Sequence, residues 1–246
     1  MRDRHLAWLR LALAIALPTW VHASPAEPPT LRIVAPTNQS MPMLRMARDL
    51  PVEGLLKDLG ELLAQRLGLR PVFVALPSKR AGPAVASGSA DLLCYVKPEW
   101  LDGKVLWTQF FLPGAGVIAA GPAAQAVSRL SDLRDQALGT VLGYRYPVLD
   151  QAFGQPVRRQ DAVDAQTNLH RLSLGRVQHA VTDRATLAYY MKAHPQSGLR
   201  EVMEVERQQL GCALSPQRAD LLRPLDQTIV RMQADGSLDT LLNRYR

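Results

Sequence analysis

Short apolar runs alternate with segments of helical spacing in the first half of the chain. Apolar runs at 31–35, 71–76 and 91–96 predict strands. Between them, leucines recur at helical spacing over 53–68, and a second helix is expected over 78–88. This alternation of strands and helices predicts an α/β lobe with a largely parallel sheet.

The loop that follows the third strand, Lys97-Pro98-Glu99-Trp100, is the first candidate for a functional site. Gly88 lies where a helix would end in the left-handed conformation, and the strand over 91–96 is apolar enough to be covered on both faces. In open α/β sheets, ligands bind at the carboxyl ends of the strands. We therefore expect this loop to face a ligand.

The second half repeats this plan after a turn-prone segment at 121–124, which is a candidate boundary. A helix, a glycine turn at Gly175 and an apolar strand lead to Asp183, as the unit around Gly88 leads to Lys97. Two similarly built lobes that present polar residues at strand ends to a shared cleft are therefore expected. The strands expected here are at 138–142, 201–206 and 209–214. The helices expected here are at 131–133, 163–174, 185–192 and 238–245, with one more that ends at Phe153. A further helical region is expected after Pro216, with a kink or restart at Pro224.

The first 23 residues predict a secretory signal peptide. They carry Arg2 and Arg4, then an apolar stretch too short to span a bilayer, and end in the small-x-small pattern Val21-His22-Ala23. Cleavage leaves 246 minus 23, or 223 residues, and lowers the formal net charge from +7 to +5 because the segment carries +2. The remaining chain is expected to be exported, without a membrane span and without the basic footprint of a nucleic-acid-binding protein.

The reactive residue types give little sign of an enzyme. Cys94 and Cys212 are the only cysteines, and two exported cysteines either pair or serve as small buried apolar residues. His170, His179 and His194 are not spaced as metal ligands, and no nucleophile-elbow or phosphate-binding motif is present. We therefore expect no catalytic residues, no metal site and no cofactor.

Five loose motifs, taken in order, resemble those of the extracellular solute-binding proteins of family 3. These are the type II periplasmic binding proteins that deliver polar amino acids and similar molecules to ABC importers. The motifs lie at 53–59 ahead of Leu67-Gly68, at 87–92, at 132–133 before Leu142-Gly143, at 174–177 leading to Asp183, and at 234–238.

The resemblance implies a periplasmic protein, secreted through the inner membrane. It also implies two lobes joined by two crossover hinge strands. Lobe 1 would comprise 30–120 and 210–246, and lobe 2 would comprise 121–209. The return strand would lie beside the strand that carries Cys94, so the resemblance implies a Cys94–Cys212 disulfide. The implied partners are a small-molecule ligand and an ABC permease in the inner membrane, and the implied state is a monomer.

The ligand site departs from the pattern of the family. In its amino-acid binders, a Thr-x-x-Arg segment holds the ligand carboxylate through a bidentate guanidinium. Here Trp100 stands in place of that arginine, and Lys97 offers only a flexible point charge. Arg145, in the loop 143–147 of the opposite lobe, is expected to take over anion binding. Asp183 matches the acidic residue that pairs with a ligand amino group.

The resemblance and the positions at strand ends together predict a set of ligand-binding residues. Several have a structural alternative: Lys97 as a solvated charge, Trp100 as packing under its loop, Asp183 as a cap of the helix 185–192, and Tyr144, Arg145 and Tyr146 as a surface turn. The set comprises Asn38, Met41, Tyr95, Lys97, Trp100, Tyr144, Arg145, Tyr146 and Asp183.

The expected function is that of a periplasmic binding protein that captures a small polar solute for an ABC importer. A sensor or accessory protein that signals to a membrane partner is an alternative that the sequence does not separate. A lyase or dehydratase on the same fold, with Glu99 or Asp183 as general acid, is a further alternative.

Overall fold

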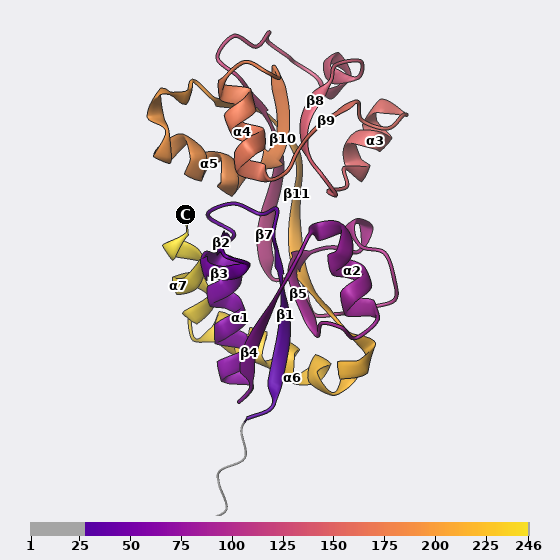
Figure 1. Ribbon diagram of the computed structural model, residues 1–246, viewed down its shortest axis with the longest axis vertical. Coiled ribbons are helices and arrows are strands. Elements are labelled where there is room, and N and C mark those ends of the chain that lie inside the picture. The colour runs from indigo at the N-terminus through magenta and orange to yellow at the C-terminus, as the bar shows by residue number, and fades with distance from the viewer. Residues whose placement is uncertain (1–27, 246) are drawn as a thin grey trace, which may run out of the picture.

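The computed structural model describes residues 28–245, which form two α/β lobes stacked along the long axis of the molecule (Figure 1). One continuous sheet path runs through both lobes in the order β4-β1-β5-β11-β7-β10-β8-β9, with β6 paired to β11. The expected signal peptide, 1–23, lies outside the described residues. No helix within the described residues is long and apolar enough to cross a membrane.

The first lobe is built on parallel strands, with β1 between β4 and β5. Helices α1, α6 and α7 pack on one face of this sheet, and α2 packs on the other. The elements are β1 (Thr30–Pro36), β4 (Arg70–Leu76), β5 (Leu92–Val96), β6 (Leu106–Trp107), α1 (Leu55–Arg66), α2 (Ser78–Ala86), α6 (Leu222–Ala234), α7 (Ser237–Arg244) and the 3-10 turns η1 (Pro98–Trp100) and η4 (Pro216–Leu221).

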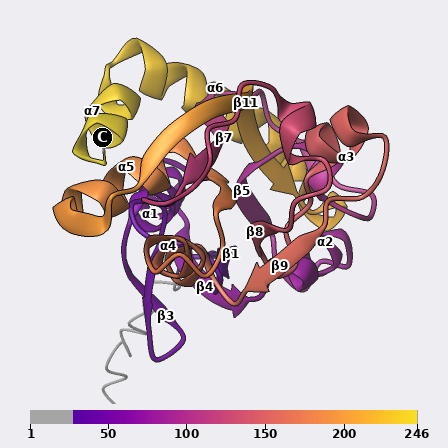
Figure 2. The same cartoon turned by 90° about the horizontal axis from the view of Figure 1, so that it is seen from above.

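The second lobe repeats the arrangement, with β8 between the parallel strands β10 and β9. Seen from above, α4 and α5 lie on one side of these strands and α3 lies on the other (Figure 2). The elements are β8 (Leu138–Val141), β9 (Arg159–Ala162), β10 (His179–Asp183), α3 (Pro147–Phe153), α4 (Ala165–Ser173), α5 (Arg184–Ala193) and the 3-10 turns η2 (Leu130–Leu133) and η3 (Pro195–Ser197).

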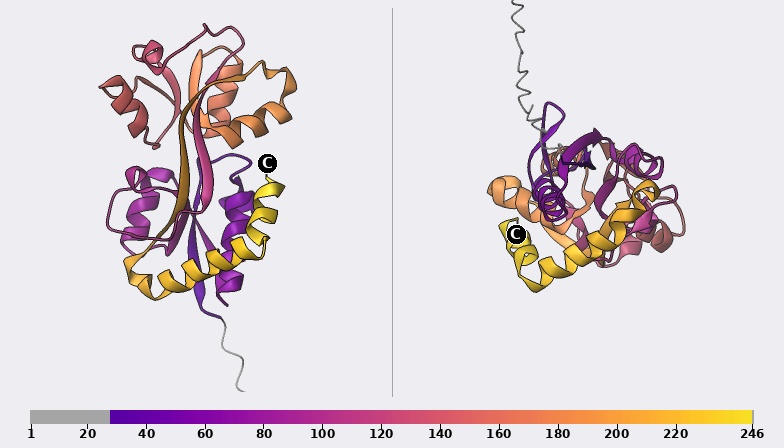
Figure 3. Two further views of the ribbon diagram at one scale, coloured as in Figure 1. Left: turned by 180° about the vertical axis from the view of Figure 1, so that it is seen from behind. Right: turned by 90° about the horizontal axis from the view of Figure 1, so that it is seen from below.

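Two long antiparallel strands, β7 (Leu112–Ala120) and β11 (Arg200–Leu214), connect the lobes (Figure 3). Their pairing runs from Arg200 opposite Ala120 to Leu210 opposite Leu112. Beyond it, β11 continues into the first lobe, where it pairs with β5 and β6. The sequence predicted two separate strands here. Register shifts between Glu201 and Met203 and between Glu204 and Glu206 disturb the side-chain alternation, so one continuous strand looked like two.

A hairpin of β2 (Arg45–Ala47) and β3 (Leu50–Glu53) lies between β1 and α1, where the sequence predicted neither a strand nor a helix. Its two turn residues, Arg48 and Asp49, both have positive φ, at 49° and 63°. A two-residue hairpin turn of this kind normally carries glycine or asparagine, so the sequence lacked the usual signal. Pro224 lies in the first turn of α6, directly after η4 ends at Leu221, so the helical region restarts there as the sequence predicted.

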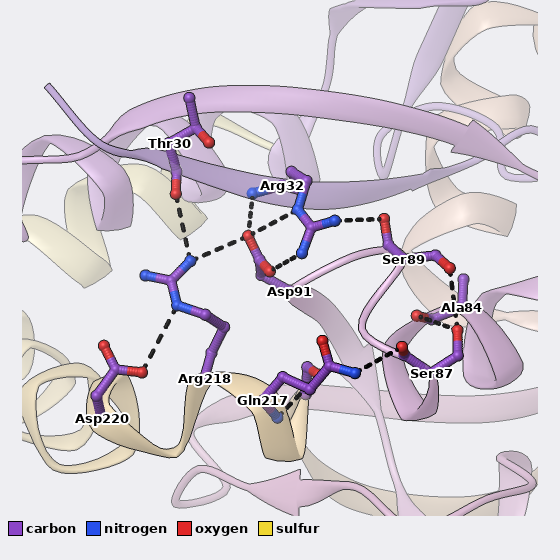
Figure 4. A network of polar contacts seen from close by, with 10 residues as sticks. Thr30, Arg32, Ala84, Ser87, Ser89, Asp91, Gln217, Arg218 and Asp220 are labelled. Carbon is purple, nitrogen blue, oxygen red and sulfur yellow. Dashed lines mark hydrogen bonds and ion pairs between the residues drawn. The ribbon is translucent and has the colours of Figure 1, made fainter. Parts of the chain in front are cut away.

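A buried carboxylate joins η4, at the start of the C-terminal helical region, to the first strand (Figure 4). The Asp91 side chain is 1% exposed and accepts hydrogen bonds from the Arg32 backbone N–H at 2.8 Å, the Arg32 guanidinium at 2.6 Å and the Arg218 guanidinium at 3.2 Å. The N–H of Ser215 donates to the Asp91 carbonyl oxygen at 2.8 Å. These contacts join β1, the start of β5 and η4, so Asp91 holds together segments that are far apart in the sequence.

Cys94 on β5 and Cys212 on β11 lie opposite each other and form a disulfide. The bond links β5 of the first lobe to β11, the strand that connects the two lobes. This is the pairing that the family resemblance implied.

Candidate functional site

A cavity of about 150 Å³ lies between the lobes. Its walls come from the ends of β5 and β10, the loop after β8, the start of α2 and the connecting strand β11. Four aromatic side chains contribute to them, and the polar lining includes a carboxylate from each of β10 and β11. The residues that matter most for the argument are Tyr95, Trp100, Tyr144, Arg145, Tyr146, Asp183, Glu206 and Gln208.

Tyr95 and Asp183 meet across this cavity because β5 and β10 both end at it. The Tyr95 hydroxyl donates a hydrogen bond of 2.8 Å to Asp183 Oδ2, so a first-lobe side chain contacts a second-lobe side chain. Tyr95 also has a φ of 65°, in the left-handed region that L residues rarely adopt. Such backbone conformations concentrate at functional sites, which agrees with the place of Tyr95 at the cleft.

Asp183 lines the cleft and caps a helix at the same time. Its Oδ1 accepts the N–H of Ala185 at 2.9 Å at the start of α5, while Oδ2 faces Tyr95. Burial raises the pKa of the Asp183 carboxyl, and the Tyr95 hydroxyl with nearby backbone amides opposes that shift only in part. Among the described residues, no cation forms an ion pair with Asp183.

Tyr144 and Tyr146 stand on the loop after β8. The Tyr144 hydroxyl is 3.4 Å from the carbonyl oxygen of Asn38 in the other lobe, and the Tyr146 hydroxyl accepts the N–H of Val141 at 2.9 Å. Burial raises the pKa of Tyr146 to about 12 and raises the pKa of Tyr144 as well. Both phenols are therefore neutral at physiological pH, and the loop is part of the cleft wall.

The cations near the cleft are already paired with carboxylates. Arg145 forms an ion pair with Asp102 of the first lobe, and both side chains are open to solvent, at 45% and 72% exposed. Lys97 Nζ lies 2.5 Å from Glu206 Oε2 and 5.1 Å from the centre of the Trp100 ring. Trp100 and Glu206 line the cavity, whereas Lys97 does not.

Two residues of the cavity lining each carry a polar side-chain atom that is buried without a hydrogen-bond partner. They are Nε1 of Trp100, which is a donor, and Oε1 of Gln208, which is an acceptor. Buried polar groups in native proteins are nearly always hydrogen-bonded, so unpaired ones in a cavity are candidates for ligand contacts.

Asn38 and Met41, both predicted to bind ligand, have their side chains outside the cavity lining. Asn38 donates through Nδ2 to the Leu142 carbonyl oxygen at 2.9 Å and accepts from Ser78 Oγ at 2.7 Å, so it links the lobes. Met41 lines a second cavity of about 200 Å³, between the first-lobe loop and helices α4 and α5. The neighbouring Gln39 lines the cleft instead of Asn38.

Sequence reasoning missed the contribution of the connecting strand. Glu206 and Gln208 both line the cavity from β11. Their spacing of two residues places them on the same face of a strand, which was the available signal. Within residues 28–245, no group of three or more His, Cys, Asp or Glu side chains is arranged to hold a metal ion.

Comparison with known proteins places the chain in a family. Residues 33–246 match the family described as bacterial extracellular solute-binding proteins, family 3. Comparison of the sequence with curated proteins found no match.

Several solved structures share the fold at low sequence identity. An ancestral amino acid-binding protein, described as a precursor of cyclohexadienyl dehydratase, is 22% identical, with a TM-score of 0.74 over 88% of this chain and 95% of its own. The substrate-binding protein of an amino acid ABC transporter is 16% identical, with a TM-score of 0.72 over 88% and 98%. A histidine kinase sensor domain similar to periplasmic binding proteins is 16% identical, with a TM-score of 0.73 over 88% and 95%.

Proposed function

Because the chain belongs to the bacterial extracellular solute-binding proteins of family 3, we propose that it is the periplasmic substrate-binding component of an ABC importer. It captures a small polar solute, an amino acid or a related compound, in the cleft between its lobes. The observation that carries this proposal is the convergence of side chains from both lobes and from β11 on one cavity, with Asp183 in contact with Tyr95 across it.

The proposed mechanism is closure of the lobes around the solute by bending of β7 and β11. The lobe division proposed is 30–120 with 210–246 against 121–209, which agrees with the course of the two strands. Polar contacts between the lobes include Tyr95 with Asp183, Asn38 with Leu142, and Arg145 with Asp102. A solute held between Asp183 and the first-lobe wall would add contacts to both lobes and so stabilise the closed form.

A thermal-shift screen of the purified mature protein tests solute capture. Amino acids, amines, polyamines, organic acids and sugars are each added at millimolar concentration. A true ligand raises the melting temperature in a concentration-dependent way, because it binds only the folded protein. Isothermal titration of each hit then measures its affinity, and a screen with no hit in any class would contradict the proposal.

A matched pair of variants tests the site. Asp183→Asn and Asp164→Asn both replace an aspartate that caps a helix of the second lobe, and asparagine caps a helix about as well. Only Asp183 lines the cavity. Asp183→Asn should therefore weaken binding of a cationic hit by about tenfold or more, whereas Asp164→Asn should leave it unchanged. Equal affinities in both variants would contradict the site.

The transport role needs a cellular test. Uptake of the radiolabelled ligand should fall when the gene is deleted and return when it is restored. A sensor role is the second candidate, favoured by the likeness to a histidine kinase sensor domain. Under that role, deletion would leave uptake unchanged and abolish the transcriptional response to the ligand.

A dehydratase or lyase role is a third candidate, because one structural neighbour is described as a precursor of a dehydratase. Incubation of the protein with each hit, followed by NMR, separates it from a binding role. An unchanged ligand supports binding, and a dehydrated or cleaved product would favour the enzyme.

A further inference from the structure

We infer that the cleft is built for an organic cation that carries no carboxylate: an amine with an apolar or aromatic body and a neutral hydrogen-bonding group. The inference rests on the proposed function, because it names the class of solute that the same cavity takes. It follows from the charges, the unpaired polar atoms and the aromatic walls of that cavity.

The first line of argument is the unmatched acid. Asp183 lines the cavity, and its hydrogen-bonding contacts are the Tyr95 hydroxyl and backbone amides, all of them neutral. A carboxylate shielded from water is stable only with strong compensation, and a ligand cation supplies the missing charge. The second acid of the lining, Glu206, already has Lys97 as its partner.

The second line is that the cations near the cavity already have carboxylate partners. Arg145 lines the cavity but is paired with Asp102, and Lys97, which does not line it, is held by Glu206. A carboxylate in the cavity would also face Asp183, a group of its own charge that forms no ion pair with a cation of the described residues. Repulsion and loss of hydration would both oppose its binding.

Two of the helix starts that border the cleft, those of α4 and α5, are also occupied. The first three N–H groups of α4, 165–167, donate to Asn38 O at 3.3 Å, Ser40 Oγ at 2.7 Å and Asp164 Oδ1 at 2.6 Å. The start of α5 is capped by Asp183 itself. Free N–H groups at helix starts are a common anion site, and in these two helices the protein has used them for its own contacts.

The third line is the chemistry of the unpaired atoms. Trp100 lines the cavity, and its Nε1 is buried without a hydrogen-bond partner. Gln208 Oε1 is the matching unpaired acceptor in the same lining. A neutral donor and a neutral acceptor suit a hydroxyl, carbonyl or amide of a ligand, whereas an arginine fork suits a carboxylate.

The fourth line is the aromatic wall. Tyr95, Trp100, Tyr144 and Tyr146 all line the cavity. Aromatic faces attract cations. One face of the Trp100 ring already makes such a contact with the Lys97 ammonium group, which lies 5.1 Å from the ring centre. The same rings provide apolar area for the body of the ligand.

Titration calorimetry with paired compounds tests the inference. Tyramine is compared with tyrosine, and agmatine with arginine, because each pair differs only in the carboxylate. We expect each amine that binds to do so about tenfold or more tightly than its parent amino acid. Equal or tighter binding of the amino acids would overturn the inference and leave the proposed function standing. Failure of both amines to bind would also overturn it, and the proposed function would fall with it only if the wider screen gave no ligand.

Substitution of Trp100 tests the cause of the preference. Trp100→Arg adds a charged fork at that position and should shift the affinity ratio toward the amino acid by about tenfold or more. Trp100→Phe removes the neutral donor without adding charge and should keep the amine preference. If the melting curve of Trp100→Arg shows that this variant does not fold, Trp100→Lys is used in its place. An unchanged ratio in the folded charged variant would overturn the role assigned to Trp100.

Discussion

Replacing Asp91 with alanine would remove the acceptor at the centre of the first lobe's charge network. The carboxylate is buried, whereas the side chains of Arg32 and Arg218 are 38% and 23% exposed. After the substitution, the two guanidinium groups could regain part of their hydration. The Arg32 backbone N–H, which donates to Asp91 at 2.8 Å, would lose its partner within the lobe.

These contacts set the size of the effect. A hydrogen bond to a charged group contributes about 1.5–3 kcal/mol, and such contributions are not additive within one network. Breaking a fully buried ion pair costs about 3–5 kcal/mol, and partial exposure of the arginines reduces that cost. We therefore expect Asp91→Ala to lower the free energy of unfolding by about 3 kcal/mol. Asp91→Asn, which keeps an acceptor but loses the charge, should lower it by about 2 kcal/mol.

Urea unfolding followed by circular dichroism, with the disulfide intact, measures these changes. Asp220→Ala is the matched control, because Asp220 contacts the same Arg218 at 3.6 Å but is 67% exposed. An exposed pair contributes little, so the control should lose less than about 1 kcal/mol. A loss below about 1 kcal/mol in Asp91→Ala, or an equal loss in Asp220→Ala, would refute the reasoning.

Three further predictions concern the disulfide and the cleft. Replacing Cys94 and Cys212 with alanine should lower the free energy of unfolding by about 2–5 kcal/mol, because the bond spans a sequence separation of 118 residues, and unfolding under non-reducing conditions checks this. The pKa of Asp183 is raised above its ordinary 3.8, so its contribution to stability is greatest below that pH and falls as the pH rises through the raised pKa. The urea midpoint of wild type minus that of Asp183→Asn should therefore decrease as the pH rises from acid to neutral. A difference that stays constant with pH would contradict this prediction. Arg145→Ala and Asp102→Ala should each change ligand affinity by about fivefold or less, since exposed ion pairs contribute up to about 1 kcal/mol, and a tenfold loss in Arg145→Ala alone would instead indicate direct ligand contact.

Local patterns in the sequence determined most of the helices and strands. Apolar runs and helical spacing gave β1, α1, β4, α2 and β5 to within a few residues, because periodicity reflects which face of an element is buried. Gly88 and Gly175 marked turns correctly, and their φ angles of 75° and 68° belong to the region that glycine adopts without steric cost. The sequence also located Asp183 at the end of a strand, because the apolar run before it indicates a buried strand.

Features that depend on pairing between distant segments were harder to predict. The turn of the β2–β3 hairpin is made by two residues that are not glycine. The strand β11 is continuous only because β7 pairs with its irregular part. Neither feature leaves a regular period in its own stretch of sequence.

The contacts of the candidate side chains were decided by the tertiary structure. The sequence placed Lys97 and Trp100 on one loop, yet only Trp100 lines the cleft, because Glu206 on β11 draws the lysine ammonium group to itself. Arg145 is held in the same way by Asp102 of the opposite lobe. A sequence fixes which charges a chain carries and which strand ends bear them. Which charges neutralise one another depends on the partners that folding brings within a few ångströms, and that decided the charge of this cleft.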